Sequence, residues 1–221
     1  MLFDQTTISM LLTGIKETLL MTFLSSAISY LIGIPLGILL VITEKDGIQP
    51  MQGLNSVLGV IINILRSVPF MILLIMVLPV TRIIVGTTLG WKAVVPPLVF
   101  AAAPYIARMV ESSLKETDSG VIEAARSMGA NNFQIIMKVY LPEALPSLII
   151  GAAISITTIL GYSAMAGFVG GGGLGTIAIN YGYYRYQTDM MLVTVVILVL
   201  IVQLIQETGT RLAHNIDKRI K

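Results

Sequence analysis

The sequence predicts an all-α protein: a polytopic membrane helix bundle with five transmembrane helices and one long polar loop. Hydrophobic residues make up 55% of the 221 residues and charged residues only 12%, whereas a soluble domain has about 25% charged residues. Several apolar stretches are long enough to cross a bilayer, which takes about 20 residues in a helix. No internal repeat is visible, so we interpret residues 1–221 as a single membrane domain.

The first two predicted spans cover residues 18–42 and 54–78, and a short polar loop separates them. Gly33 and Gly37 lie inside the first span. Glycine weakens a helix in water, but in a membrane bundle it lets neighbouring helices approach closely. We therefore expect this stretch to be a packed span.

Arg66 lies near the middle of the second predicted span and is the only formal charge well inside a span. A charge at that depth is costly, which marks Arg66 as a candidate functional residue. Alternatively, the helix lies closer to the cytoplasm and Arg66 extends towards the lipid headgroups. Asn63 and Ser67 are its expected hydrogen-bond partners in either case.

The remaining three spans are predicted over residues 91–114, 144–165 and 190–206. Trp91 begins the first of these as an interfacial anchor, and Arg108 is expected near its other interface. A long polar loop over residues 115–142 precedes the fourth span.

The distribution of cations predicts the orientation of the chain, because cytoplasmic loops carry an excess of lysine and arginine. One side, which includes the long polar loop and the C-terminal tail, holds most of them: Lys45, Arg108, Lys115, Arg126, Lys138, Arg211, Lys218, Arg219 and Lys221. The other side has Lys16, Arg82, Lys92 and Arg185. The long loop and the C-terminus are therefore predicted to be cytoplasmic, with the N-terminus outside.

The long loop is predicted to form two short helices. Asp118 can cap the first helix, and Gly129 can end it in a left-handed turn. Asn131 and Asn132 can cap the second helix, which we expect Pro142 to stop or bend.

The first loop helix has the residues of a helix that docks into a partner's groove. Ala124, Ala125 and Met128 are expected to lie close together on one face, where small side chains let another surface approach. Glu123 and Arg126 supply polar edges to that face.

This loop resembles the EAA loop of ABC-importer permeases. That pattern reads Glu-Ala-Ala, three residues, Gly, nine residues, then Ile-x-Leu-Pro. This chain has Glu123-Ala124-Ala125, three residues, Gly129, nine residues, then Val139-Tyr140-Leu141-Pro142. The one departure is valine for isoleucine, a conservative apolar exchange.

The resemblance extends over nearly the whole chain. The chain resembles in particular the methionine-importer branch of the family, in the segments at residues 66–70, 85–88, 102–111, 161–165 and 172–175. It implies the permease subunit of a type I ABC importer, forming the path for D- or L-methionine across the bacterial cytoplasmic membrane. It implies a homodimer, since one chain has one docking helix, over about residues 120–128. It further implies two cytoplasmic ATPase subunits, which bind ATP and Mg, and an extracytoplasmic methionine-binding protein.

The residues that the resemblance implies for ATPase coupling are Glu123, Ala124, Ala125, Arg126, Met128, Gly129, Leu141 and Pro142. We predict no cofactor, metal or catalytic residue on this chain. The sequence has no nucleotide-binding loop of the form G-x-x-x-x-G-K-[ST] and no cysteine. Its net charge of only +2 gives no indication of nucleic-acid binding.

Tyr162, Ser163 and Met165 are candidates for a gate or a low-affinity solute contact, because they pair polar groups with a flexible thioether. Ordinary helix packing is the alternative for each residue. The Gly170-to-Gly173 run is interpreted as a hinge or gate-lining loop, since no lysine follows it as phosphate binding requires.

Other functional classes remain as alternatives. A permease for another small amino acid fits the same loop pattern. A self-powered secondary carrier needs coupling groups in the membrane, and Arg66 is the one candidate. A membrane scaffold needs no ATPase. An intramembrane hydrolase needs a base near Ser163, whereas the sole histidine, His214, lies in the tail.

Overall fold

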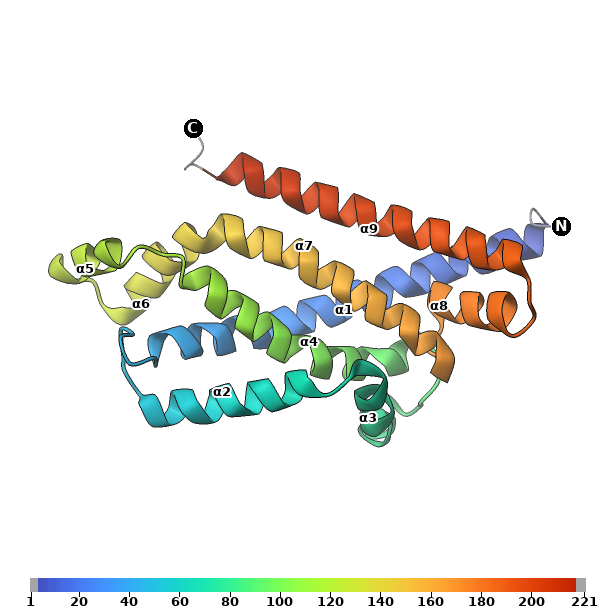
Figure 1. Ribbon diagram of the computed structural model, residues 1–221, viewed down its shortest axis with the longest axis horizontal. Helices are drawn as coiled ribbons and strands as arrows, with labels where there is room; N and C mark the ends of the chain where they lie inside the picture. Colours follow the sequence, from blue (N-terminus) through green and yellow to red (C-terminus); the bar gives the residue numbers. More distant parts are fainter. Residues whose placement is uncertain (1–3, 218–221) are drawn as a thin grey trace. The chain divides into compact units, whose positions relative to one another are not determined.

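The structure, a computed structural model, describes residues 4–217; the predicted cytoplasmic cations Lys218, Arg219 and Lys221 lie outside the described residues. Within that range all regular secondary structure is helical and there is no β-strand (Figure 1), which confirms the all-α prediction. The main elements are α1 (Gln5–Ile42), α2 (Gln52–Ser67), α3 (Phe70–Val85), α4 (Trp91–Leu114), α5 (Ser119–Ser127), α6 (Asn132–Ile135), α7 (Leu141–Met165), α8 (Gly173–Ile177) and α9 (Thr188–Ile216). Three tighter or wider helical turns are η1 (Ile136–Tyr140), η2 (Ala166–Val169) and η3 (Ala178–Tyr183).

Several helical segments are long and apolar enough to cross a membrane, which confirms a polytopic membrane protein. Within residues 4–217, four qualify on their own: Gln5–Ile42, Trp91–Leu114, Asn132–Val169 and Thr188–Ile216. Helices α2 and α3 qualify only as a broken pair, so the number of spans is four or up to five. The count of five therefore stays a prediction.

Helix α4 has the bounds predicted for the third span, whereas α1 begins at Gln5 rather than at residue 18. Helix α9 likewise continues to Ile216, past the predicted end at residue 206. Apolar composition locates the part of a helix that can lie in hydrocarbon, and a helix can extend beyond that part into the polar interface.

The second predicted span, over residues 54–78, is broken in the structure, because α2 ends at Ser67 and α3 begins at Phe70. Pro69 has φ −59° and ψ 134°, which is not helical. Proline has no N–H to donate, and its ring disfavours the helical conformation of Val68 before it. The carbonyl of Pro69 instead accepts a hydrogen bond from the N–H of Leu73 (3.0 Å) in the new helix.

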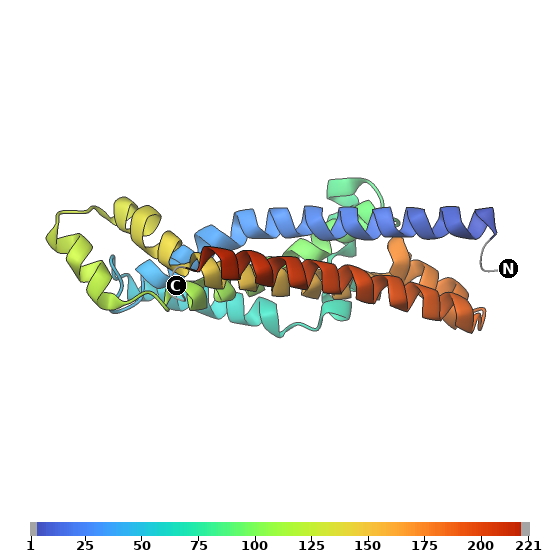
Figure 2. The same ribbon diagram turned by 90° about the horizontal axis from the view of Figure 1, so that it is seen from above.

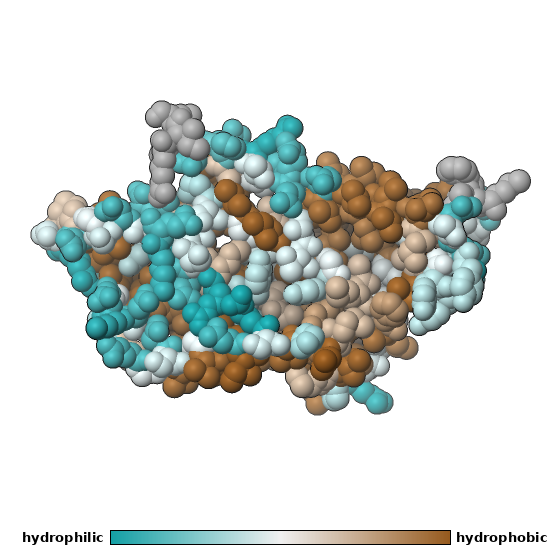
Figure 3. Space-filling model, viewed as in Figure 1, coloured by the Kyte–Doolittle hydropathy of each residue, from teal (hydrophilic) through white to brown (hydrophobic). Residues whose placement is uncertain are grey.

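The described chain forms two compact units, and four of its long helices contribute to both. Unit 1 consists of Met1–Ile28, Val68–Ala102 and Ser155–Glu207. Its core includes Leu174, Ile177 and Met190, and partly buried residues of α1 and α9 pack against them. Figure 3 shows hydrophobic side chains gathered over the middle of α9. Leu192, Val196 and Leu200 of this helix are exposed. This surface suits contact with lipid or another membrane chain.

Unit 2 consists of Ser29–Ser67, Ala103–Ile154 and Thr208–Lys221. Leu40, Ile62 and Ala107 form its core. A Cβ atom at Gly33 would lie 2.6 Å from Cγ2 of Ile106, so glycine there permits the close helix contact that the sequence predicts. Figures 1 and 2 show the C-terminal part of α1 beside α2, and α5 beside α6.

Candidate coupling loop and solute path

Helix α5 begins and ends as the sequence predicts. The Asp118 carboxylate accepts a hydrogen bond from the N–H of Gly120 (2.7 Å) and caps the helix. Gly129 has φ 82°, a left-handed conformation that glycine adopts without a steric penalty. The N–H of Ala130 then donates to the carbonyl of Ala125 (3.0 Å) and closes the turn.

A reciprocal pair of hydrogen bonds starts the second loop helix. The Asn131 side chain accepts from the N–H of Gln134 (2.8 Å), and the Gln134 side chain accepts from the N–H of Asn131 (2.9 Å). This capping box confirms Asn131 as the cap of α6.

Pro142 does not stop the second loop helix, contrary to one of the two expectations for it. The chain stays helical from Asn132 to Met165 through the π-helical turn η1, which directly precedes Leu141. In an α-helix the proline ring would clash with the carbonyl four residues earlier. The wider turn over Ile136–Tyr140 shifts those carbonyls, so Pro142 fits at the start of α7.

The expectation that Ala124, Ala125 and Met128 share one face is wrong for Ala125. Ala125 is buried at 6% exposure, whereas Ala124 is exposed and Met128 is 82% exposed. Adjacent helix positions are about 100° apart, so Ala125 turns inward when Ala124 faces out. We define the loop surface by its exposed members Val121, Ala124, Met128 and Phe133.

The two charged residues of α5 behave differently. Arg126 points back into unit 2, where its guanidinium donates to the carbonyl of Ile48 (2.7 Å). Glu123 is exposed and has no hydrogen bond or ion pair within residues 4–217. Arg126 is thus placed to fix the loop, and Glu123 is free to meet a cation from outside the chain.

A chain of ion pairs lies beside the loop, and the sequence analysis did not identify it. Arg108 contacts Glu111 (2.7 Å), Glu111 contacts Lys115 (3.0 Å), and Lys115 contacts Glu44 at the end of α1 (2.9 Å). Spacing was the available signal, since residues three and four apart share one face of a helix. We call these four residues the charge network.

Two further features concern the two cations of the charge network. The Arg108 guanidinium also donates to the carbonyl of Gly59 and to the Asn63 side chain, both at 3.1 Å, which joins α4 to α2. Burial alone would lower the pKa of Lys115, but its hydrogen bonds to Glu44 and Glu111 outweigh that effect and raise the pKa above its usual value. Lys115 therefore stays charged throughout the physiological pH range.

Arg66 is exposed at the end of α2 and has neither of its expected partners. Asn63 accepts a hydrogen bond from Arg108 instead, and the Ser67 hydroxyl donates to the carbonyl of Asn63 (2.7 Å). Because Asn63 and Ser67 make hydrogen bonds with other groups, the side chain of Arg66 stays accessible and makes no pair with either of them.

Two of the three gate candidates on α7 make internal contacts in unit 1. The Tyr162 ring stacks on Phe70 at a centroid distance of 4.5 Å. Ser163 is fully buried and donates to the carbonyl of Leu160 (2.7 Å), so its hydroxyl has no base as partner. Met165 is 46% exposed and is the most accessible of the three.

Part of the glycine run is held against α1. The Glu17 carboxylate accepts from the N–H of Gly173 (2.7 Å), and the Thr18 hydroxyl accepts from the N–H of Leu174 (2.9 Å). No role was predicted for Glu17 from the sequence. Its carboxylate accepts a hydrogen bond at the start of α8, where the first N–H groups have no partner within the helix.

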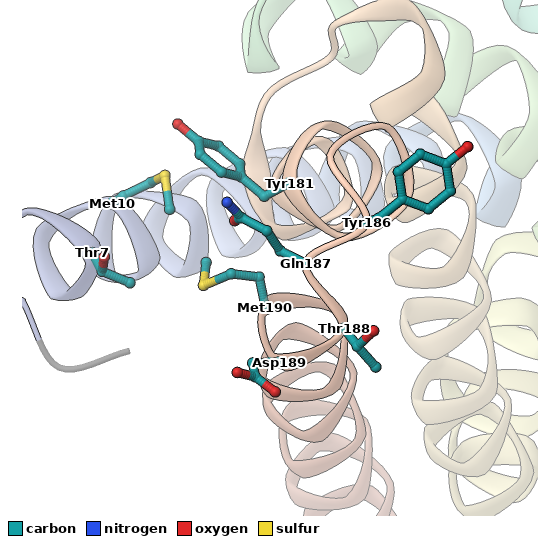
Figure 4. Close-up of a pocket in the computed structure, with 8 residues that line it drawn as sticks. All are labelled: Thr7, Met10, Tyr181, Tyr186, Gln187, Thr188, Asp189 and Met190. Carbon is teal, nitrogen blue, oxygen red and sulfur yellow. The ribbon is translucent and has the colours of Figure 1, made fainter. Parts of the chain in front are cut away.

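A pocket of about 600 Å³ lies in unit 1 where α9 begins (Figure 4). Its lining mixes hydrogen-bonding groups with two thioethers, from Thr7, Met10, Tyr181, Tyr186, Gln187, Thr188, Asp189 and Met190. Tyr186 has φ 56°, a conformation that non-glycine residues rarely adopt, and it is 88% exposed. The described residues contain no cluster of histidine, aspartate and glutamate that fits a metal ion.

Comparisons with known proteins agree with the loop pattern. The family described as "Binding-protein-dependent transport system inner membrane component" matches residues 33–221. The probable D-methionine transport system permease protein MetI of Vibrio cholerae is 48% identical over 210 residues, which are 95% of this chain and 93% of that protein. The methionine import system permease protein MetP of Bacillus subtilis is 44% identical over 82% of each chain.

The fold also matches a solved transporter. A chain of the MetNI methionine ABC transporter, solved in inward-facing conformations, superposes with a TM-score of 0.96 at 46% identity. The match covers 98% of this chain and 100% of that chain.

Proposed function

The chain belongs to the family of inner membrane components of binding-protein-dependent transport systems, and we propose that it is the permease subunit of an ATP-driven methionine importer. It is a transport component, and ATP hydrolysis takes place on a separate subunit. The observation that carries the substrate assignment is the similarity, over 95% of this chain, to a relative named for D-methionine transport. D-methionine, L-methionine or both are the transported solutes.

The loop surface is the contact with the ATPase. Val121, Ala124, Met128 and Phe133 present small and apolar side chains that fit a groove. Glu123 adds a free carboxylate beside them.

The other members of the loop pattern position the contact. Ala125 and Arg126 fix α5 against unit 2, and Gly129 sets the angle between α5 and α6. Leu141 and Pro142 mark the point where the loop helix passes into α7. Displacement of the loop by ATP binding on the partner then switches the helices between inward- and outward-facing arrangements.

The assembly has two copies of this chain, two cytoplasmic ATPase subunits and an extracytoplasmic methionine-binding protein. The chain acts as one membrane domain with five spans in the bacterial cytoplasmic membrane, with its N-terminus outside and its C-terminus in the cytoplasm. The distribution of lysine and arginine supports this orientation. The chain itself uses no cofactor.

Tyr162, Ser163, Met165 and Arg66 are the candidate path residues. The exposure of Met165 and Arg66 supports solute contact at those two positions. Tyr162 supports the path indirectly, because its stacking on Phe70 holds the helix that carries Met165, whereas the Ser163 hydroxyl bonds within that helix.

Uptake of labelled methionine tests the proposal. Vesicles contain this chain, its ATPase and the binding protein outside, with or without enclosed ATP. We expect accumulation only with ATP, and competition by excess methionine but not by unrelated amino acids. ATP-driven uptake of another amino acid alone would contradict the substrate, and uptake without ATP from a verified complex would favour a secondary carrier.

A further inference from the structure

An apolar groove of about 460 Å³ on unit 1 is not used by the proposed coupling or transport steps. Helix α1 contributes Leu24 and Ile28, α3 contributes Val85, and α4 contributes Val95 and Val99. Lys92 is the one charged residue in its lining. Apolar side chains offer water no hydrogen-bond partners, so an apolar occupant is favoured over water in this groove.

The groove follows one face of α4. Trp91, Val95 and Val99 are spaced four residues apart and therefore lie along one stripe of the helix. The two valines are smaller than Trp91 at one end and Phe100 at the other, which leaves space between the large side chains.

The length of the groove matches one leaflet of a bilayer. From Trp91 to Phe100 a helix rises about 14 Å at 1.5 Å per residue. This is about half of the roughly 30 Å hydrocarbon core. A helix of that length and of about 10 Å diameter has a volume near 1,100 Å³, so the groove fits an acyl chain rather than a helix of a second copy.

Lys92 sets the charge of the occupant. Its ammonium lies 5.7 Å from the centre of the Trp91 ring, at the end of the groove. Lys92 is exposed and has no ion pair within residues 4–217. It also lies in the first turn of α4, where the helix dipole disfavours a cation and favours an anion.

We propose that this groove binds one acyl chain of an anionic phospholipid, with the lipid phosphate on the Lys92 ammonium. Tryptophan side chains are enriched at the level of the lipid headgroups, and this binding mode places the Trp91 indole there. The acyl chain then contacts Val95 and Val99, which have too little bulk to close the groove themselves.

Quenching of Trp91 fluorescence by brominated lipids tests this site, because Trp91 is the single tryptophan of the chain. The complete transporter is placed in vesicles that contain increasing fractions of brominated phosphatidylglycerol or brominated phosphatidylcholine. ATPase tryptophans outside the hydrocarbon contribute an unquenched background. We expect the anionic lipid to reach half-maximal quenching at a several-fold lower fraction than the zwitterionic lipid.

Three variants at lysine positions test whether Lys92 causes the preference for the anionic lipid. Lys92→Gln should remove the preference for the anionic lipid while quenching persists, and Lys92→Arg should retain the preference. Lys16→Gln is the matched control, an exposed cation outside the groove, and should leave the preference unchanged. Val99→Phe, which fills the groove, should reduce quenching by both lipids.

Two outcomes would overturn the proposal. Equal quenching of the unmodified protein by both lipids would mean that only the general lipid annulus reaches Trp91. Absence of quenching by either lipid would mean that protein, such as a second copy of the chain, covers the groove.

Discussion

Both compact units pack helices closely at glycines, as at Gly33 in unit 2, but they differ in the other contacts that join their helices. In unit 2, the charge network and the contacts of Arg108 with α2 join α4 to α2 and to the turn after α1 by ion pairs and by hydrogen bonds that side chains make. In unit 1, the contact between α7 and α8 depends on a missing side chain, since a Cβ at Gly175 would lie 2.3 Å from the carbonyl oxygen of Ala164. Directional bonds suit the unit that carries the proposed coupling loop, because they keep the bonded helices in register when the loop is displaced. Close backbone packing in unit 1 gives stability but leaves little tolerance for added volume.

Adding a side chain at Gly175 should destabilise unit 1 and have the largest effect on stability of the changes considered. Gly175→Val should lower the free energy of unfolding by about 3 kcal/mol, because the obstacle is backbone that cannot rotate away. The thermal unfolding midpoint of the purified protein measures this. Gly161→Ala is the matched control on α7, where a Cβ meets nothing within 4 Å, and an unchanged or raised midpoint is expected. Equal destabilisation by both variants would contradict the packing argument.

Neutralising Glu111, at the centre of the charge network, should lower the free energy of unfolding by about 2 kcal/mol, because Arg108 and Lys115 then have no carboxylate between them. Glu111→Gln is the change, and the side chain is 11% exposed. Asp46→Asn removes an exposed carboxylate that lies outside the network and should have little effect. The ratio of ATP hydrolysed to methionine imported should rise only for Glu111→Gln. An unchanged ratio would mean that the network is structural alone.

The turn between the loop helices offers a smaller and more local test. Gly129→Val should raise the same ratio without unfolding the helices, because the strain in a left-handed backbone is about 1–3 kcal/mol for such residues. A Cβ at Gly129 meets no atom within 4 Å, so backbone conformation is the only obstacle. Gly129→Asn should retain most coupling, since asparagine tolerates this conformation. Normal transport by Gly129→Val would count against the docking geometry.

Removing the cap of α6 should have the smallest effect. Asn131→Ala should destabilise the loop by about 1 kcal/mol, whereas Asn131→Ser should keep most of the stability, because serine also caps helices. Hydrogen exchange of the α6 amides measures the difference. Equal exchange in both variants would show that tertiary contacts, and not the cap, hold the helix.

Local signals predicted much of this molecule. Asp118 and Asn131 cap their helices and Gly129 forms the left-handed turn, as predicted, because caps and such turns depend on a few neighbouring residues. The break at Pro69 was missed because apolar composition alone does not distinguish a continuous span from two helices. The same composition includes Pro35, which lies inside α1 without ending it.

The candidate site was less accessible to sequence reasoning. The partner of Glu17 is 156 residues away at Gly173, and that of Lys115 is 71 residues away at Glu44. No spacing rule connects positions at such separations, because the tertiary fold brings them together. Arg66 was favoured over Arg108 for the same reason, since depth within a span was visible but the contacts with Gly59 and Asn63 were not.

The most direct test of the account is whether the ATPase covers the loop surface. The chain has no cysteine, so a single cysteine can report accessibility at one position. Met128→Cys, in the loop surface, and Tyr186→Cys, a highly exposed position in unit 1, are labelled with a maleimide reagent with and without the ATPase. The account predicts strong protection of residue 128 on assembly and no protection of residue 186. Equal labelling of residue 128 in both conditions, in a complex that still couples ATP hydrolysis to methionine uptake, would contradict it.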